Sequence, residues 1–306
     1  MEMRKAYNDT LRLLLEEDER VVVLDADLAS ASGTSALYTD YPERTINVGI
    51  SEANMISSAA GMSLTGLLPF VHSFAPFVSR RVLDQIYMSG VYSDNKLHIY
   101  ASDPGYWAQH NGGTHTTYED LSAVLAFPNI IVSAPSTPNQ FKAILKHYVN
   151  NPGVYFTRAT RKELPEIYAD DATFELGKAV THGTGKDAVI FAIGVMVHEA
   201  LEAQAALKAD GIDVTVVDCF SLKPFDTDTA LNLINDSKVV LTAENHSVHG
   251  GLTSIVENVM VENTIARPFK AVAVNNVFGE VGDSNYIKNK HNLTADAIIE
   301  AVKTRI

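Results

Sequence analysis

Short apolar runs alternate with longer segments of helical spacing along the first half of the chain. The apolar runs are of the kind that parallel sheets bury on both faces, and we expect strands at residues 21–24, 45–48, 97–101, 130–133 and 154–157. Between them, spacing and capping signals predict helices at residues 2–17, 52–64, 74–90, 118–126 and 139–149. This alternation predicts a parallel sheet covered by helices.

The same pattern starts again after a polar segment, residues 164–185, that lacks clear periodicity. Beyond it we expect strands at residues 187–193, 214–217, 239–243 and 271–274, and helices at residues 197–210, 228–235, 251–262 and 294–303. The chain is therefore predicted to be an α/β protein with two doubly wound domains, residues 1–165 and 186–306, joined by a linker at residues 166–185.

Charge and composition narrow the classes of partner. A formal net charge of −13 without clustered Lys and Arg argues against nucleic acid. No apolar stretch approaches the roughly 18 residues that a membrane span requires. The single cysteine, Cys219, and an amino-terminal region without an apolar signal segment favour a cytoplasmic location.

Glu52 is the most informative single residue, because it is the one charged residue among apolar and small side chains, closely after an expected strand. It is either an exposed residue at a helix start or a buried acid suited to proton transfer. In parallel α/β sheets, ligands bind at the carboxyl ends of strands. Asp27, Asp103 and Arg161 also follow expected strands there.

Three further groups could join Glu52 at one site. Phe74 and Phe77 are expected to share one face near a helix start, a spacing that is equally common in helix cores. The glycine-containing loop of residues 109–116 carries His110 and His115, which could be acid–base groups or ordinary surface histidines. Arg161, in the run 158–162, could hold a phosphate or belong to a solvated charge run.

In this order along the chain, these motifs resemble the transketolase family. Residues 48–52 are similar to the segment whose glutamate binds the aminopyrimidine of thiamine diphosphate, and residues 111–115 resemble the family's Asp-Gly-Pro-Thr-His loop. The resemblance spans the whole chain. It implies a pyrimidine-binding domain at residues 1–165 and a transketolase C-terminal domain at residues 186–306.

The resemblance also implies roles for individual residues. Glu52 and His115 would be catalytic, with Glu52 favouring the imino tautomer of the aminopyrimidine and His115 exchanging protons with substrate hydroxyls. The cofactor-binding residues would be Glu52, Asp27, Gly49, Ile50, Phe74 and Phe77. The substrate-binding residues would be Arg4, Arg161, Asn111, His110 and Ser32, with the two arginines on the sugar phosphate.

One family motif is absent. The Gly-Asp-Gly element, which binds magnesium and through it the cofactor diphosphate, does not occur in the 306 residues. We therefore expect no metal ligands here and a partner, the N-terminal transketolase subunit with that motif, in a dimer of heterodimers. The expected reaction is transfer of a two-carbon glycolaldehyde unit from a ketose phosphate to an aldose, as in pentose phosphate metabolism.

Several positions depart from the family pattern. Asn111 replaces an Asp, Arg80 stands where a third aromatic residue is common, Ala31 replaces a phosphate-contacting Ser, and no His adjoins Asp103. These changes leave unusual or branched sugars open as substrates. Two other functions stay open: the beta subunit of a 2-oxoacid dehydrogenase, or a noncatalytic binding or regulatory module.

Overall fold

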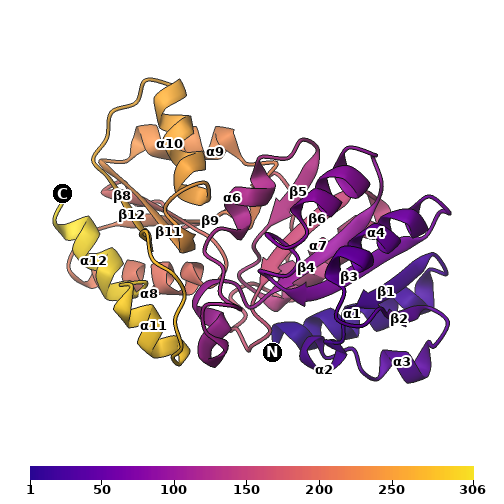
Figure 1. Cartoon of the computed structure of the whole chain (residues 1–306). Coiled ribbons are helices and arrows are strands. Elements are labelled where there is room, and N and C mark those ends of the chain that lie inside the picture. The colour runs from indigo at the N-terminus through magenta and orange to yellow at the C-terminus, as the bar shows by residue number, and fades with distance from the viewer. The chain divides into compact units, whose positions relative to one another are not determined.

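The computed structural model describes residues 1–306, which form two compact units (Figure 1). The first unit comprises Met1–Pro104 and Ala123–Phe174, and the second comprises Gly105–Ser122 and Glu175–Ile306. The chain therefore leaves the first unit once for an 18-residue segment of the second, before it completes the first sheet.

The first unit contains a parallel sheet with the strand order β5-β6-β4-β3-β1-β2. Its elements are α1 (Met3–Glu17), β1 (Val21–Asp25), α2 (Ala29–Ser32), α3 (Leu37–Asp40), β2 (Thr45–Asn47), α4 (Glu52–Ser63), β3 (Leu68–Phe74), α5 (Leu83–Gln85), the π-helix η1 (Ile86–Val91), β4 (Leu97–Ser102), β5 (Ile130–Ser133), α7 (Pro138–Asn150) and β6 (Val154–Ala159). The helix α6 (Asp120–Leu125) contains the boundary between Ser122 and Ala123. The strands end together at one edge of the sheet, as parallel pairing requires.

The core of this unit is aromatic as well as aliphatic. Helices α1 and α7 pack together, and the ring of Tyr7 from α1 lies 4.8 Å from Tyr100 on β4 and 5.8 Å from Phe141 on α7, between centroids. The expected helix start before α7 is confirmed, because the hydroxyl of Thr137 accepts a hydrogen bond from the backbone of Gln140.

The expected helix at residues 74–90 forms only from residue 83 onward, and the strand β3 was not expected. Phe74 is the last residue of β3, which lies between β4 and β1, and residues 75–82 form turns before α5. Pro69 and His72 break the apolar run in sequence. In the structure His72 is buried and its ring nitrogens contact Asp25 and Ser102, so the polar group is tolerated inside the sheet.

The second unit contains a sheet with the order β12-β11-β8-β9-β7, in which only β7 is antiparallel to its neighbour. Its elements are the 3-10 segment η2 (Gly105–Asn111), β7 (Val180–His182), β8 (Ala188–Ala192), α8 (Met196–Ala209), β9 (Val214–Asp218), β10 (Ser221–Lys223), α9 (Thr227–Asp236), β11 (Val239–Ser247), α10 (Leu252–Glu262), β12 (Phe269–Val274), α11 (Ser284–Lys290) and α12 (Ala295–Lys303). The segment 166–185, expected to be a linker, thus contains the strand β7. None of the helices has both the length and the apolar character needed to cross a membrane.

Candidate active site

Glu52 is both a helix-start residue and a buried acid. It is the first residue of α4, and only 4% of its surface is exposed. Its Oε2 accepts a hydrogen bond of 2.8 Å from Nη1 of Arg81. The amino end of a helix favours a negative charge, so the backbone and Arg81 both stabilise the carboxylate.

Arg81 connects this acid to the aromatic pair. Its guanidinium carbon lies 3.9 Å from the ring centroid of Phe77, within the range of a cation–π contact. The rings of Phe74 and Phe77 lie 6.2 Å apart at an interplanar angle of 60°. The two phenylalanines are therefore close together, as expected, although Phe74 ends a strand and Phe77 lies in a turn.

Sequence reasoning missed Arg81 and singled out its neighbour, Arg80. Only the turn that replaces the expected helix brings the Arg81 guanidinium onto both Phe77 and Glu52.

The loop before α4 is held by Asn47. Its side-chain oxygen accepts hydrogen bonds from the backbone amides of Asp27, at 3.1 Å, and Gly49, at 2.9 Å. Gly49 has a φ of 72°, which glycine adopts without strain. Ile50, beside it, is 79% exposed. The loop therefore presents an apolar side chain to solvent two residues before the buried Glu52.

Arg161 and Arg4 form a second cluster at the same edge of the first unit. Arg161 Nε lies 2.5 Å from Asp103 Oδ2, and the Arg161 backbone donates to Oδ1 of the same carboxylate at 2.8 Å. The Arg161 guanidinium lies 4.8 Å from the Phe74 centroid, so Phe74 contacts both clusters. The backbone of Arg4 donates to the Arg161 carbonyl at 3.2 Å, which places the two predicted phosphate ligands next to each other.

Ser32, a predicted substrate-binding residue, lies in the interior of the first unit. Its side chain is fully buried, and its hydroxyl lies 2.7 Å from that of Thr34 and 3.5 Å from Asp25 Oδ2. Asp25 in turn contacts Nδ1 of His72 at 3.2 Å, and Nε2 of His72 lies 3.0 Å from the Ser102 hydroxyl. These buried residues form a hydrogen-bonded network beneath the strand ends.

The three remaining predicted residues, His110, Asn111 and His115, lie in the second unit, on η2 and the following loop. His110 and Asn111 are exposed, and His115 is partly buried with Nδ1 2.9 Å from the Thr114 hydroxyl. The loop 112–116 packs closely on residues 279–281. The contact leaves no room for a side chain at Gly113, where an added Cβ would lie 2.7 Å from the Gly279 carbonyl oxygen.

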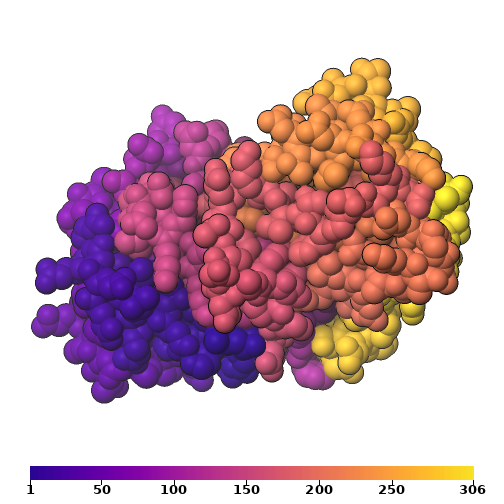
Figure 2. Space-filling model, turned by 180° about the vertical axis from the view of Figure 1, so that it is seen from behind, coloured from indigo at the N-terminus to yellow at the C-terminus, as the bar shows by residue number.

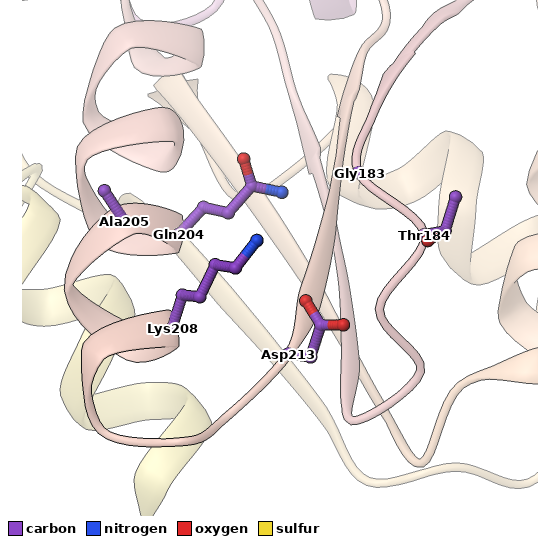
Figure 3. A pocket seen from close by; sticks show the side chains of 6 residues that line it. All are labelled: Gly183, Thr184, Gln204, Ala205, Lys208 and Asp213. Atoms are coloured by element: carbon purple, nitrogen blue, oxygen red, sulfur yellow. The ribbon is translucent and has the colours of Figure 1, made fainter.

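The second unit also contains a shallow cavity of about 320 Å³, shown in Figure 3. It is lined by Gly183, Thr184, Gln204, Ala205, Lys208 and Asp213. The amide of Gln204 is already bound to the carbonyls of His182 and Val214. None of the predicted site residues lines this cavity.

The residues of the first unit suit the pyrimidine end of thiamine diphosphate. A buried carboxylate can bond a ring nitrogen, and the phenyl groups can pack on an aromatic ring. No group of three or more His, Cys, Asp or Glu is arranged to hold a metal ion. The donor set thus fits the heterocycle and offers no carboxylate cluster for magnesium diphosphate.

The fold is that of a two-unit α/β chain, and its first unit holds a buried acid beside paired aromatic rings. The family comparison agrees: the model of the transketolase pyrimidine-binding domain matches residues 1–166, and that of the transketolase C-terminal domain matches residues 177–298. The chain belongs to the transketolase family, whose members use thiamine diphosphate.

Individual relatives are split transketolase subunits. A 6-deoxy-6-sulfo-D-fructose transketolase subunit from Clostridium sp. (strain MSTE9) is 40% identical over 98% of this chain and 92% of its own. A subunit of an apulose-4-phosphate transketolase from Actinobacillus succinogenes is 30% identical over 92% of this chain and 90% of its own. A solved split-gene transketolase, described as an inactive beta4 tetramer, is 36% identical with a TM-score of 0.90, covering 100% of this chain and 98% of that one.

Proposed function

We propose that this chain is the pyrimidine-binding subunit of a two-subunit transketolase that transfers a two-carbon glycolaldehyde unit from a ketose to an aldose. The observation that carries the proposal is the buried Glu52, held by Arg81 beside the paired rings of Phe74 and Phe77. An acid with this degree of burial beside aromatic rings suits a planar, nitrogen-containing ligand.

Glu52 would bind the pyrimidine ring nitrogen and hold the proton shared with it. When bound, thiamine diphosphate supplies the carbanion-stabilising chemistry through which a carbon–carbon bond beside a carbonyl breaks and re-forms. Phe74 and Phe77 would exclude water from the ring, and the φ of 72° at Gly49 would bring its backbone close to the cofactor. His115 would exchange protons with substrate hydroxyls.

Arg4 and Arg161 would hold the anionic end of the sugar. A planar guanidinium matches the oxygens of a phosphate or a sulfonate. A ketose phosphate is the substrate that the family resemblance favours. A sulfonated ketose is the second candidate, because the relative at 40% identity is described as acting on 6-deoxy-6-sulfo-D-fructose.

Magnesium and the cofactor diphosphate would be held by a partner subunit that carries the Gly-Asp-Gly motif, in a dimer of heterodimers. The absence of that motif from the sequence and the match to split-gene relatives support this assignment.

Reconstitution tests the proposal. The chain is co-purified with a subunit that carries Gly-Asp-Gly, and transfer from xylulose 5-phosphate or 6-deoxy-6-sulfofructose to an aldose phosphate is measured with thiamine diphosphate and magnesium. We expect turnover only when both subunits are present. Decarboxylation of a 2-oxoacid without ketose turnover would instead assign the chain to a 2-oxoacid dehydrogenase. A stable homodimer that binds neither partner nor cofactor would indicate a noncatalytic module.

A further inference from the structure

The two arginines of the predicted anion site are paired with acids of unequal burial. Arg161 is bound to Asp103, whose side chain is 4% exposed. That carboxylate also accepts hydrogen bonds from the Arg161 backbone and from the Thr160 hydroxyl. Because Asp103 is buried and accepts hydrogen bonds from several donors, it is a fixed partner of Arg161.

Arg4 is bound to Glu2 in a different setting. Nε of Arg4 lies 2.7 Å from Glu2 Oε2, and Nη2 lies 3.3 Å from Oε1, so one carboxylate occupies one edge of the guanidinium. The side chains are 37% and 41% exposed. The indigo segment that carries them is at the surface in Figure 2. A pair this exposed separates at little cost in free energy.

An open hollow of about 510 Å³ adjoins this pair. It is lined by Glu2, Arg4, Lys5, Asn8, Asp9, Ser30, Gly33, Ser35 and Ala36. The hydrogen bond from Arg4 lowers the pKa of Glu2 most strongly, so Glu2 is ionised at neutral pH. A small anion that enters the hollow therefore meets a guanidinium edge already occupied by a carboxylate.

The other cation that lines the hollow, Lys5, is itself paired with Asp9 at 2.7 Å. Ala31 has no hydroxyl, and its carbonyl accepts from Arg161 Nη1 at 3.4 Å. The Ser102 hydroxyl is buried against His72. The two arginines and the two acids, Glu2 and Asp103, sum to a formal charge of zero, and moving Glu2 away leaves a charge of +1.

We propose that Glu2 is a specificity-determining residue that competes with the terminal anion of the substrate for Arg4. This inference rests on the proposed function of Arg4 and Arg161. The substrate displaces Glu2 while Asp103 keeps Arg161 in place. Glu2 thereby reduces the advantage of a phosphorylated sugar over an uncharged one.

Anion binding tests the competition without any turnover. Binding of inorganic phosphate to the chain is measured by its shift of the thermal midpoint at constant ionic strength, for the wild type, Glu2→Gln, Arg4→Met and the double variant. We expect Glu2→Gln to strengthen phosphate binding about two- to fivefold, as for an exposed ion pair, and to have no effect when Arg4 is Met. Glu163→Gln is the matched control, because Glu163 is an exposed acid paired with the amino group of Met1.

An equal gain in the Arg4→Met background, or in Glu163→Gln, would mean a general charge effect and would overturn the proposal. So would unchanged binding in Glu2→Gln. In the reconstituted two-subunit enzyme, Glu2→Gln should lower KM for a phosphorylated ketose more than for its unphosphorylated form. If no ketose is turned over but the phosphate result holds, the proposed function fails and the competition by Glu2 stands.

Discussion

Arg81 joins Glu52 to Phe77, because Nη1 donates to Glu52 Oε2 at 2.8 Å while the guanidinium lies 3.9 Å from the Phe77 centroid. Arg161 repeats this arrangement with Asp103 and Phe74, at 2.5 and 4.8 Å. Each arginine is thus fixed by one acid and one phenyl ring. Under the proposed function, the first set serves the cofactor and the second serves the sugar. Since Oε2 of Glu52 is engaged with Arg81, Oε1 is the oxygen that remains for a ligand.

Replacing Glu52 with Gln tests its role in proton transfer. The amide is nearly isosteric, so the fold should persist, but it cannot hold the proton shared with the pyrimidine nitrogen. We expect turnover by the reconstituted enzyme to fall at least about 100-fold, as for loss of a general acid–base group. Turnover is measured with saturating cofactor and both subunits.

Glu202→Gln is the control for that variant, because Glu202 is exposed on α8. It should leave turnover and the urea midpoint unchanged. Wild-type turnover in Glu52→Gln would remove Glu52 from the mechanism.

Arg81→Met tests whether the arginine stabilises the buried carboxylate. The change removes an ion pair and a cation–π contact. Because Arg81 is 45% exposed, solvent screening limits the expected loss to about 1 kcal/mol in the free energy of unfolding. The measurement is urea unfolding of the wild type, both single variants and the double variant with Glu52→Gln.

In that cycle the two substitutions should be less than additive, because removing either partner already breaks the pair. Additive losses would show that Arg81 and Glu52 act independently.

Much of the fold follows from the sequence because buried parallel strands read as continuous apolar runs. Residues 130–133 coincide with β5, and residues 239–243 lie within β11. The strand β3 could not be predicted, since His72 looks exposed in sequence and is accommodated only through Asp25 and Ser102 on neighbouring strands. Contacts between distant segments, rather than local propensity, decide such a strand.

The candidate site was likewise predictable only in part. The proximity of Phe74 and Phe77 and of Arg4 and Arg161 was predictable from the resemblance, which carries long-range information. The pairing of Arg81 with Glu52 was not, because it depends on a turn where a helix was expected. The burial of Ser32 was also hidden, since a serine after a strand reads equally well as a ligand or as a partner of Asp25.

Substitution by Ala should lower stability at a crowded glycine, Gly105, and raise it at an open one, Gly61. Gly105 has a φ of 63°, and a Cβ there would lie 2.1 Å from Oδ1 of Asn245, so Gly105→Ala should lower stability by about 2 kcal/mol or more. Gly61 lies within α4 with no atom within 4 Å of the added Cβ. Gly61→Ala should therefore raise stability by about 0.5–1 kcal/mol.

Urea midpoints of the two variants provide the measurement. A neutral effect at Gly105 would mean that the loop beginning at that residue shifts freely away from Asn245. A loss at Gly61 would point to a close neighbour on the exposed face of α4, such as another subunit.

His98 predicts how stability depends on pH. Complete burial lowers the pKa of its imidazole from 6.5 to about 3, and Nε2 lies 3.1 Å from the Thr157 hydroxyl. Between those two values the unfolded chain binds a proton that the folded chain does not. Stability therefore rises with pH through this window and falls as the pH drops below about 6.5, by about 1 kcal/mol per pH unit from this group.

His98→Gln should flatten that dependence, because Gln can keep a polar contact to Thr157 without titrating. The variant is expected to be less stable at pH 7, so the slope of the urea midpoint between pH 4.5 and 6.5 is compared rather than its absolute value. His147→Gln is the control. His147 lies in the last turn of α7 and is only partly buried, so this variant should keep most of the wild-type slope. If His98→Gln retains the full slope, the acid sensitivity comes from other groups and His98 is protonated without unfolding the first unit.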